Sequence, residues 1–553
     1  MTKICVLLLA ASWAAAPAFA QTDPGDPHAA CAAVGYVPAG LLGKPLALRA
    51  GTGAGRGPGQ AHEAVTTTSA EAQAFYDQGI AYLHSYVWIE AARSFHEALR
   101  HDPKLAMAHV GLSRVFTGLE DADAARAALE KAESLAASVS PREQRRIALR
   151  RVQLEALADL GNLQKHVAYK KALDDALAVD MDDVELWLLR GNAEEATAAG
   201  RGQRGGAASV AFYDRALALR PDHFAAHHYL VHSYEMIGSI DQALAHGEIY
   251  ARLAASVPHA HHMWAHDLRR VGRTQDAIAE FRKADALENA YYAAEGIPAE
   301  YDWHHQHNLD LLSTSHQHQG QLREAEALMR RSFALPPPYE YSAFNKKEWP
   351  GFLLARGRVE EARAAARTLV GSRFAAARAM GHVALAQAAL SEGLLDEAQA
   401  EAALGRKAFE EVEATPWSAR NAIVPYLDLV KGSLQLRNGE AEAGRTLLMD
   451  VQKRLRALPG PDAWMQALFV LESIARTARE AGDWELADYT ARQMLEHDGA
   501  YAGAHYALGL VAEHRGEAAA ARQSFAQAER LWASADPDLP ELARVRPRVT
   551  AAR

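Results

Sequence analysis

A glycine followed five residues later by an alanine recurs along most of this chain, and this recurrence constrains the fold more than any other feature. The copies are Gly238/Ala243, Gly272/Ala277, Gly320/Ala325, Gly357/Ala362, Gly393/Ala398, Gly482/Ala487 and Gly516/Ala521. The intervals from Gly238 to Gly272 and from Gly482 to Gly516 are both 34 residues. A glycine frees the turn between two helices, and a small alanine lets the second helix cross the first closely. The pattern therefore predicts helix hairpins stacked one on the next.

The most complete copy of the unit lies in residues 71–105. Apolar residues recur there at helical spacing in two runs, joined by a short turn and closed by Asp102-Pro103. The positions that define the unit are Phe75, Gly79, Tyr82, Ala91, Phe95, Ala98 and Pro103. This order resembles the tetratricopeptide repeat of about 34 residues. The resemblance implies an all-α, right-handed superhelical solenoid of about eleven or twelve helix hairpins.

Five segments are expected along the chain. Residues 1–20 carry Lys3, an apolar stretch and an Ala18-Phe19-Ala20 cleavage site, which is typical of a secretory signal peptide. Residues 21–70 should be a flexible leader, because residues 51–60 are rich in glycine. An N-terminal array (71–335) and a C-terminal array (339–535) are separated by Pro336-Pro337-Pro338, through which a helix cannot continue. Residues 536–553 should be a capping tail.

The expected location is the periplasm or the exterior of the cell, with cleavage near Ala20-Gln21. The resemblance is to exported bacterial tetratricopeptide-repeat proteins. After the signal peptide, no run reaches the ~18 apolar residues of a transmembrane helix. Cys5 leaves with the signal peptide, so Cys31 has no partner for an internal disulfide, and its role stays open. The formal net charge is −10 without a clustered basic face, which argues against nucleic acid as a partner.

Histidines gather in three bursts between residues 223 and 318. Of the 25 histidines in the chain, fourteen lie there: His223, His227, His228, His232, His246, His259, His261, His262, His266, His304, His305, His307, His316 and His318. The turn glycines place each burst on the first helix of one of three successive repeats. The bursts should therefore lie side by side along one wall of the solenoid.

Two pairs of histidines occupy equivalent positions in adjacent repeats. His228/His232 and His262/His266 are each spaced i, i+4, so each pair shares one helix face. In the tetratricopeptide-repeat family the first helix of each repeat lines a concave groove. The resemblance therefore implies a ligand groove lined by His228, His232, His262, His266, His307 and Asp310. By the same frame His227 and His261 should pack in the interior, and His304, His305 and His316 should lie in a loop or on a solvated face.

Three functions are compatible with the sequence. The resemblance implies a scaffold that binds proteins or peptides and needs no cofactor, and no catalytic motif is recognised. Alternatively, His228, His232, His262, His266 and His307 bind a divalent transition metal such as Zn or Cu. A carboxylate such as Asp310 or Asp302 could complete the ligand set of such a metal-binding protein or metalloenzyme. The third possibility is a structural component of a cell-envelope assembly.

Overall fold

The computed structural model describes residues 37–49, 61–119, 121–195, 205–337, 340–413, 420–458 and 460–550. Within these ranges all regular secondary structure is helical. The helices are α1 (Ala39–Leu42), α2 (Ala70–His84), α3 (Trp88–His101), α4 (Ala106–Gly118), α5 (Ala122–Leu135), α6 (Pro141–Leu157), α7 (Leu163–Val179), α8 (Val184–Asn192), α9 (Ala207–Leu219), α10 (Phe224–Met236), α11 (Ile240–Leu253), α12 (Pro258–Arg270), α13 (Thr274–Glu295), α14 (Trp303–His318), α15 (Leu322–Ala334), α16 (Glu340–Asn345), α17 (Glu348–Ala355), α18 (Val359–Val370), α19 (Ala375–Ser391), α20 (Leu395–Glu413), α21 (Arg420–Arg437), α22 (Ala441–Arg456), α23 (Pro461–Glu480), α24 (Trp484–His497), α25 (Ala502–His514), α26 (Ala518–Leu531) and α27 (Pro540–Thr550).

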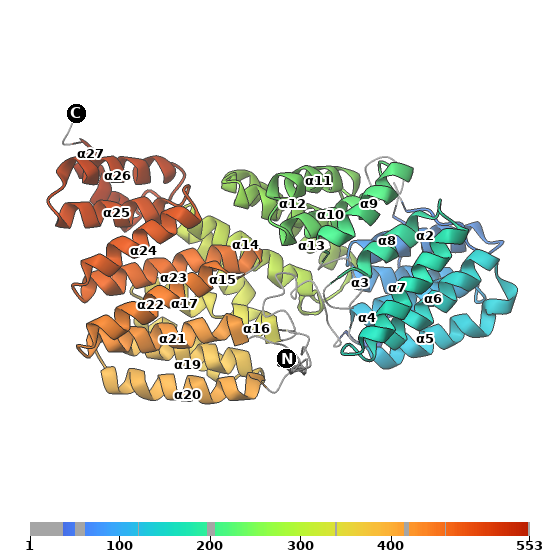
Figure 1. The fold of residues 1–553 in the computed structure, drawn as a ribbon, viewed down its shortest axis with the longest axis horizontal. Coiled ribbons are helices and arrows are strands. Elements are labelled where there is room, and N and C mark those ends of the chain that lie inside the picture. Colours follow the sequence, from blue (N-terminus) through green and yellow to red (C-terminus); the bar gives the residue numbers. More distant parts are fainter. Residues whose placement is uncertain are drawn as a thin grey trace, which may run out of the picture.

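Consecutive helices pack in pairs, and each pair stacks on the next (Figure 1). The pairs run from α2 with α3 to α14 with α15, and then from α17 with α18 to α25 with α26. Together they make twelve hairpins in the described part of the chain, with the short α16 as an addition. The predicted all-α solenoid of tetratricopeptide-type hairpins is therefore confirmed.

Glycine shapes the hairpins at two kinds of position. The seven predicted turn glycines have φ between +70° and +77°, a left-handed conformation that residues with a Cβ atom adopt at a cost. Gly79 serves close approach instead. A Cβ atom there would lie 2.6 Å from the ring of Phe95, so only glycine lets α2 approach the ring carried by α3. Glycine is thus required in the turns for their left-handed backbone and at Gly79 for the close approach of two helices.

Both ends of the described chain pack against the solenoid. Leu42 and Leu46 are buried, and the backbone N–H of Leu46 donates to Glu97 on α3 at 3.0 Å. Residues 37–49 of the predicted flexible leader are therefore packed, whereas residues 1–36 and 50–60 lie outside the described ranges. In the predicted capping tail, α27 buries Leu542 and Val545 against the last hairpin.

The C-terminal array lies against the N-terminal array at α14. Helix α15 ends at Ala334 before the predicted proline boundary, and α16 begins at Glu340. Helix α23 nevertheless packs against α14, which precedes that boundary in sequence (Figure 1). The Nε2 atom of His318 at the end of α14 also lies 2.7 Å from Oδ2 of Asp498, just after α24. No helix among the described residues combines the length and the apolar character that crossing a bilayer requires.

Candidate metal centre

Three neighbouring helices carry the histidine bursts. Helices α10, α12 and α14 are the first helices of three successive hairpins, and α12 packs against both of the others. The predicted placement of the bursts is therefore confirmed. The reason lies in the repeat, because equivalent positions of stacked hairpins come to lie side by side.

The first triad consists of His228 and His232 on α10 and His259 on α12. The Nε2 atom of His228 lies 3.0 Å from Nε2 of His232 and 3.1 Å from Nε2 of His259. The side chains are buried, with exposed fractions of 0%, 0% and 2%. Three ring nitrogens thus converge on one point inside the protein.

The second triad consists of His262 and His266 on α12 and His307 on α14. The Nε2 atoms of His262 and His266 are 2.8 Å apart, and the ring centroid of His307 is 4.7 Å from that of His262. One nitrogen from each ring can be chosen so that all three lie within 4.8 Å of one another, as in the first triad. The two i, i+4 pairs predicted from the sequence therefore lie in separate triads rather than in one site.

His304 on α14 lies between the triads. Its ring centroid is 5.0 Å from that of His259 and 4.5 Å from that of His262. Its Nδ1 atom is hydrogen-bonded to Glu288, and its buried Nε2 atom has no hydrogen-bond partner among the described residues. The Nε2 atom of His304 is therefore a seventh imidazole nitrogen that is available to a ligand beside the triads.

The outer nitrogens of the triad rings face oxygen atoms. Nδ1 of His228 donates to the backbone oxygen of His84 at 2.7 Å, because a carbonyl can only accept. The side-chain oxygen of Asn308 lies 2.9 Å from Nδ1 of His262, and the side-chain nitrogen of Asn308 donates to the backbone oxygen of Phe281 at 3.0 Å. Nδ1 of His262 is therefore a donor too. In a neutral ring this leaves the Nε2 lone pair pointing into the triad.

Carboxylates take the same outer position at two further rings. Nδ1 of His307 lies 3.3 Å from Oδ2 of Asp462 on α23, and Nδ1 of His266 lies 3.4 Å from Oε1 of Glu235 on α10. An acceptor on the outer nitrogen is the usual second-layer contact of a metal-binding histidine, because it fixes the tautomer and the ring orientation.

Burial keeps the central imidazoles neutral. Desolvation, followed by the neighbouring imidazoles, holds the pKa values of His259 and His262 well below the usual value of 6.5. Neutral imidazole is the form that binds metal ions, whereas imidazolium has no lone pair to offer. Zinc, copper, nickel and iron are the ions that this donor set suits.

The groove expected at these residues is filled by other parts of the chain. Tyr86, in the turn between α2 and α3, places its ring centroid 4.7 Å from that of His228 and 5.3 Å from that of His259. Tyr86 has a φ of +56°, which is costly for a residue with a side chain. Asp462 on α23 lies 3.3 Å from His307 of the second triad. The expectation of an open, ligand-lined groove at these histidines is therefore corrected, since all of them are buried.

A small cavity reaches the rings of His259 and His304. Its volume is about 30 Å³, and Tyr86, Glu90 and Asp302 also line it. That volume is enough for about one water molecule. The cavity thus leaves room for one small ligand beside the imidazoles.

Some predicted site residues lie elsewhere. Asp310 belongs to neither triad: it accepts a hydrogen bond from Ser332 at 2.7 Å, and burial raises its pKa to about 6. Asp302 caps α14 and accepts a hydrogen bond from Tyr292 at 2.8 Å. His304, His305 and His316 are buried on α14 rather than on a loop or a solvated face, which corrects that prediction.

Packing explains His227 and His261, as expected. His227 bonds to His246 and to the backbone of Pro221, and His261 bonds to Glu280 at 2.6 Å. Both are buried beside the triads but outside them. They are therefore matched controls for any test of the triads.

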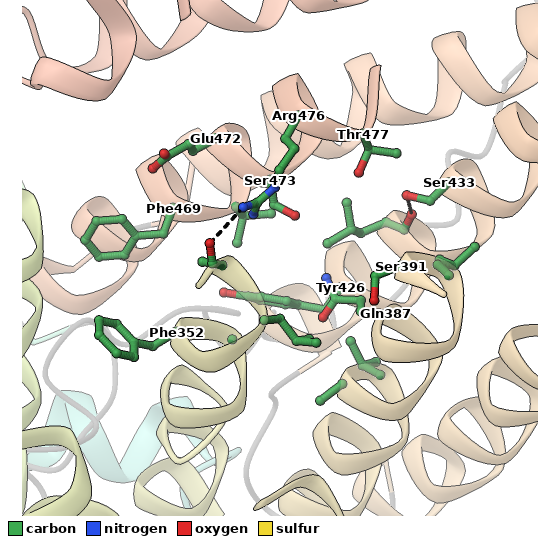
Figure 2. A pocket seen from close by; sticks show the side chains of 18 of the residues that line it. Phe352, Gln387, Ser391, Tyr426, Ser433, Phe469, Glu472, Ser473, Arg476 and Thr477 are labelled. Carbon is green, nitrogen blue, oxygen red and sulfur yellow. Dashed lines mark hydrogen bonds between the residues drawn. The ribbon is translucent and has the colours of Figure 1, made fainter. Parts of the chain in front are cut away.

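A second, larger cavity lies in the C-terminal array (Figure 2). Its volume is about 390 Å³, and Phe352, Tyr426 and Phe469 supply aromatic walls. Arg476 lines it and donates to the backbone oxygen of Ala355 at 3.0 Å. Its size suits a small ligand or a few side chains of a bound peptide.

Comparisons with known proteins give structural similarity only. No protein-family model and no curated protein matches the chain. The human IFIT1 dimer with PPP-AAAA is similar over 78% of this chain and 91% of its own, at 12% identity and a TM-score of 0.38. The APC/C hetero-tetramer Cut9–Hcn1 is similar over 86% of this chain and 90% of its own, at 12% identity and a TM-score of 0.31. The fold is therefore established by the hairpins of this chain alone.

Proposed function

We propose that this protein binds transition-metal ions in the buried histidine centre formed by the two triads and His304. The observation that carries the proposal is the orientation of the rings. Nδ1 atoms of His228, His262 and His307 face outer oxygen acceptors at 2.7, 2.9 and 3.3 Å. The Nε2 atoms of His228 and His262 point at the other rings of their triads. Zinc and copper are the ions we expect, because neutral imidazole suits both.

The spacing of the nitrogens is close to what a metal ion needs. Zinc–nitrogen bonds of about 2.0–2.1 Å in tetrahedral geometry place ligand nitrogens about 3.3–3.4 Å apart. The Nε2 pairs around His228 are 3.0 and 3.1 Å apart. A small outward movement of the rings would therefore admit an ion.

A purely structural role explains the centre less well. The Nε2 atoms of His304 and His307 are buried without a hydrogen-bond partner among the described residues. Each such group costs about 1–3 kcal/mol relative to a satisfied one. Apolar side chains would fill the same space without that cost. A metal ion accounts for the imidazoles because it uses their lone pairs.

The test is the metal content of protein produced without a polyhistidine tag. We expect bound zinc or copper after dialysis, and an increase in thermal stability on adding the metal. The double variant His228→Ala/His232→Ala should lower the bound metal, whereas His227→Ala and His261→Ala should leave it unchanged. Metal at trace level in the wild type, with no thermal shift on titration with either ion, would contradict the proposal.

Binding of a protein or peptide is a second candidate, favoured by the cavity of about 390 Å³ in the C-terminal array. We propose this cavity, not the buried histidines, as the place where a peptide side chain would enter. A peptide-display selection with wild-type protein and Phe469→Ala would test it, since a peptide bound there should bind the variant more weakly. Peptides that bind both proteins equally would exclude this cavity.

Export remains a proposal that rests on residues 1–20. In the periplasm or outside the cell the centre could sequester or carry an ion, and membership of an envelope assembly is compatible with that role. Fractionation of cells that produce the full chain, with N-terminal sequencing of the mature protein, tests cleavage near Ala20. Retention of the uncleaved chain in the cytoplasm would exclude export without affecting the metal proposal.

A further inference from the structure

We infer that the centre holds two metal ions, one in each triad, and that the ion in the second triad links the two arrays through Asp462. This inference rests on the proposed metal binding and adds the number of ions and the part of the chain on which the second ion depends.

The triads are separate ligand sets. The first joins α10 to α12, the second joins α12 to α14, and no histidine belongs to both. The two sets meet at His259 and His262, whose ring centroids are 5.9 Å apart. Three nitrogens converge within each set, so a single ion cannot bind the nitrogens of both triads. Two neighbouring ions satisfy all six rings, and His304 lies where it can add a ligand to either.

Carboxylates near the centre make two cations acceptable in a buried place. Glu288 contacts His304, Asp462 contacts His307, and Glu235 contacts His266. Buried cations need nearby anions, because the interior solvates charge poorly. Three carboxylates in contact with ligand rings supply that compensation.

The outer contacts differ between the triads. His228 in the first triad is oriented by a neutral backbone carbonyl at 2.7 Å. In the second triad, the Nδ1 atoms of His307 and His266 lie 3.3 and 3.4 Å from the carboxylates of Asp462 and Glu235. A carboxylate raises the basicity of the imidazole more than a carbonyl does, which strengthens the metal bond. The second triad should therefore fill at the lower metal concentration.

Asp462 is the residue through which the C-terminal array contacts the second triad. It is the second residue of α23, it is 2% exposed, and it also accepts a hydrogen bond from Tyr341 at 2.9 Å. It lies 155 residues beyond His307 in the sequence. An ion bound to His307 strengthens the contact of that ring with Asp462. The ion should therefore favour the arrangement in which α23 packs against α14.

The experiment counts bound ions in the full-length protein. We expect two equivalents for the wild type, one for His228→Ala/His232→Ala, one for His262→Ala/His266→Ala, and none when all four are changed. Asp462→Asn, which keeps the shape of the side chain, should retain the first ion and weaken the second about 10–100-fold. Circular dichroism of each variant checks that the helices are retained.

Hydrogen exchange tests the linkage. Metal should slow exchange in the first turns of α23 in the wild type and in His228→Ala/His232→Ala, but not in His262→Ala/His266→Ala. One equivalent in the wild type, lost in both double variants, would overturn the two-ion inference and leave metal binding intact. Zero equivalents would overturn the proposed function itself. Two equivalents with no effect of Asp462→Asn on affinity or exchange would overturn the linkage.

Discussion

Asn308 holds the ring of His262 in one orientation. Its side-chain oxygen accepts from Nδ1 of His262 at 2.9 Å, and its side-chain nitrogen donates to the backbone oxygen of Phe281 at 3.0 Å. The second contact decides which end of the amide faces the ring. Asn308 therefore directs Nε2 of His262 into the second triad without being a ligand itself.

Asn308→Ala should weaken metal binding about 10–100-fold, because the outer contact of a ligand ring is lost. It should also lower the free energy of unfolding of the metal-free protein by about 1–3 kcal/mol, since a buried carbonyl loses its donor. Titration with Zn²⁺ or Cu²⁺ and urea unfolding measure the two effects. Ser313→Ala, also buried on α14, is the control and should leave affinity unchanged. Equal affinities in wild type and Asn308→Ala would show that the amide does not orient the ring.

The variant His259→Leu should change metal binding without lowering the stability of the metal-free protein. The variant should lose the ion of the first triad, because one of three nitrogens is gone. Its metal-free form should be as stable as the wild type or more stable, within about 1 kcal/mol, because leucine fills the space without a buried polar nitrogen. Urea unfolding in the presence of a chelator and metal titration test the two statements. A loss of several kcal/mol in the metal-free form would favour a structural role for this histidine.

The repeat explains why part of the centre is visible in the sequence. The turn glycines place His228/His232 and His262/His266 on equivalent faces of neighbouring helices, and the structure keeps that register. His259 is not among the residues predicted from the repeat positions, although it precedes His262 by three residues and i, i+3 residues share a helix face.

Other parts of the centre depend on contacts that a repeat pattern does not contain. In α14 the rings that reach the centre are His304 and His307. Asp310, predicted from repeat position, lies about one helical turn beyond His307 and is hydrogen-bonded to Ser332 instead. Asp462 lies on a helix of a distant hairpin and contacts His307 from there. Tyr86 itself has a left-handed backbone conformation, which the neighbouring residues in the sequence do not predict. A one-dimensional pattern predicts nearest-neighbour contacts, and these are contacts between distant repeats.

Substitutions of Tyr86 should affect the rate of metal release and the stability of the fold separately. Tyr86→Ala and Tyr86→Gly both remove the ring that covers the first triad, so both should release metal faster than the wild type. Tyr86→Gly should nevertheless be about 0.5–1 kcal/mol more stable than Tyr86→Ala, because only glycine adopts a φ of +56° without strain. Stopped-flow transfer of metal to a chelator and urea unfolding make the comparison. If Tyr86→Ala were the more stable variant, the left-handed conformation would not be a source of strain.

Asp183, which belongs to neither triad, gives a pH-dependent contribution to stability. It caps α8 and is ion-paired with Arg146 and, at 3.0 Å, with Arg142. Burial alone would raise the pKa of Asp183, but the two guanidinium groups outweigh it and the pKa is lowered. A lowered pKa in the folded state means that the ion pair stabilises the protein above the unfolded pKa of about 3.9 and that this stability is lost as the pH falls through the folded pKa.

Asp183→Asn should therefore cost about 3 kcal/mol at pH 7, where the ion pair is fully formed, and less at pH 3.5. Asparagine caps a helix as well as aspartate does, so the loss reports the ion pair and not the cap. Asp121→Asn is the matched control, because Asp121 caps α5 at an exposed position and should change stability by less than about 0.5 kcal/mol. Urea midpoints at both pH values, with hydrogen exchange in α8 to localise the effect, provide the measurement. A loss of the same size at pH 3.5 and pH 7 would show that the charge of Asp183 is not its cause.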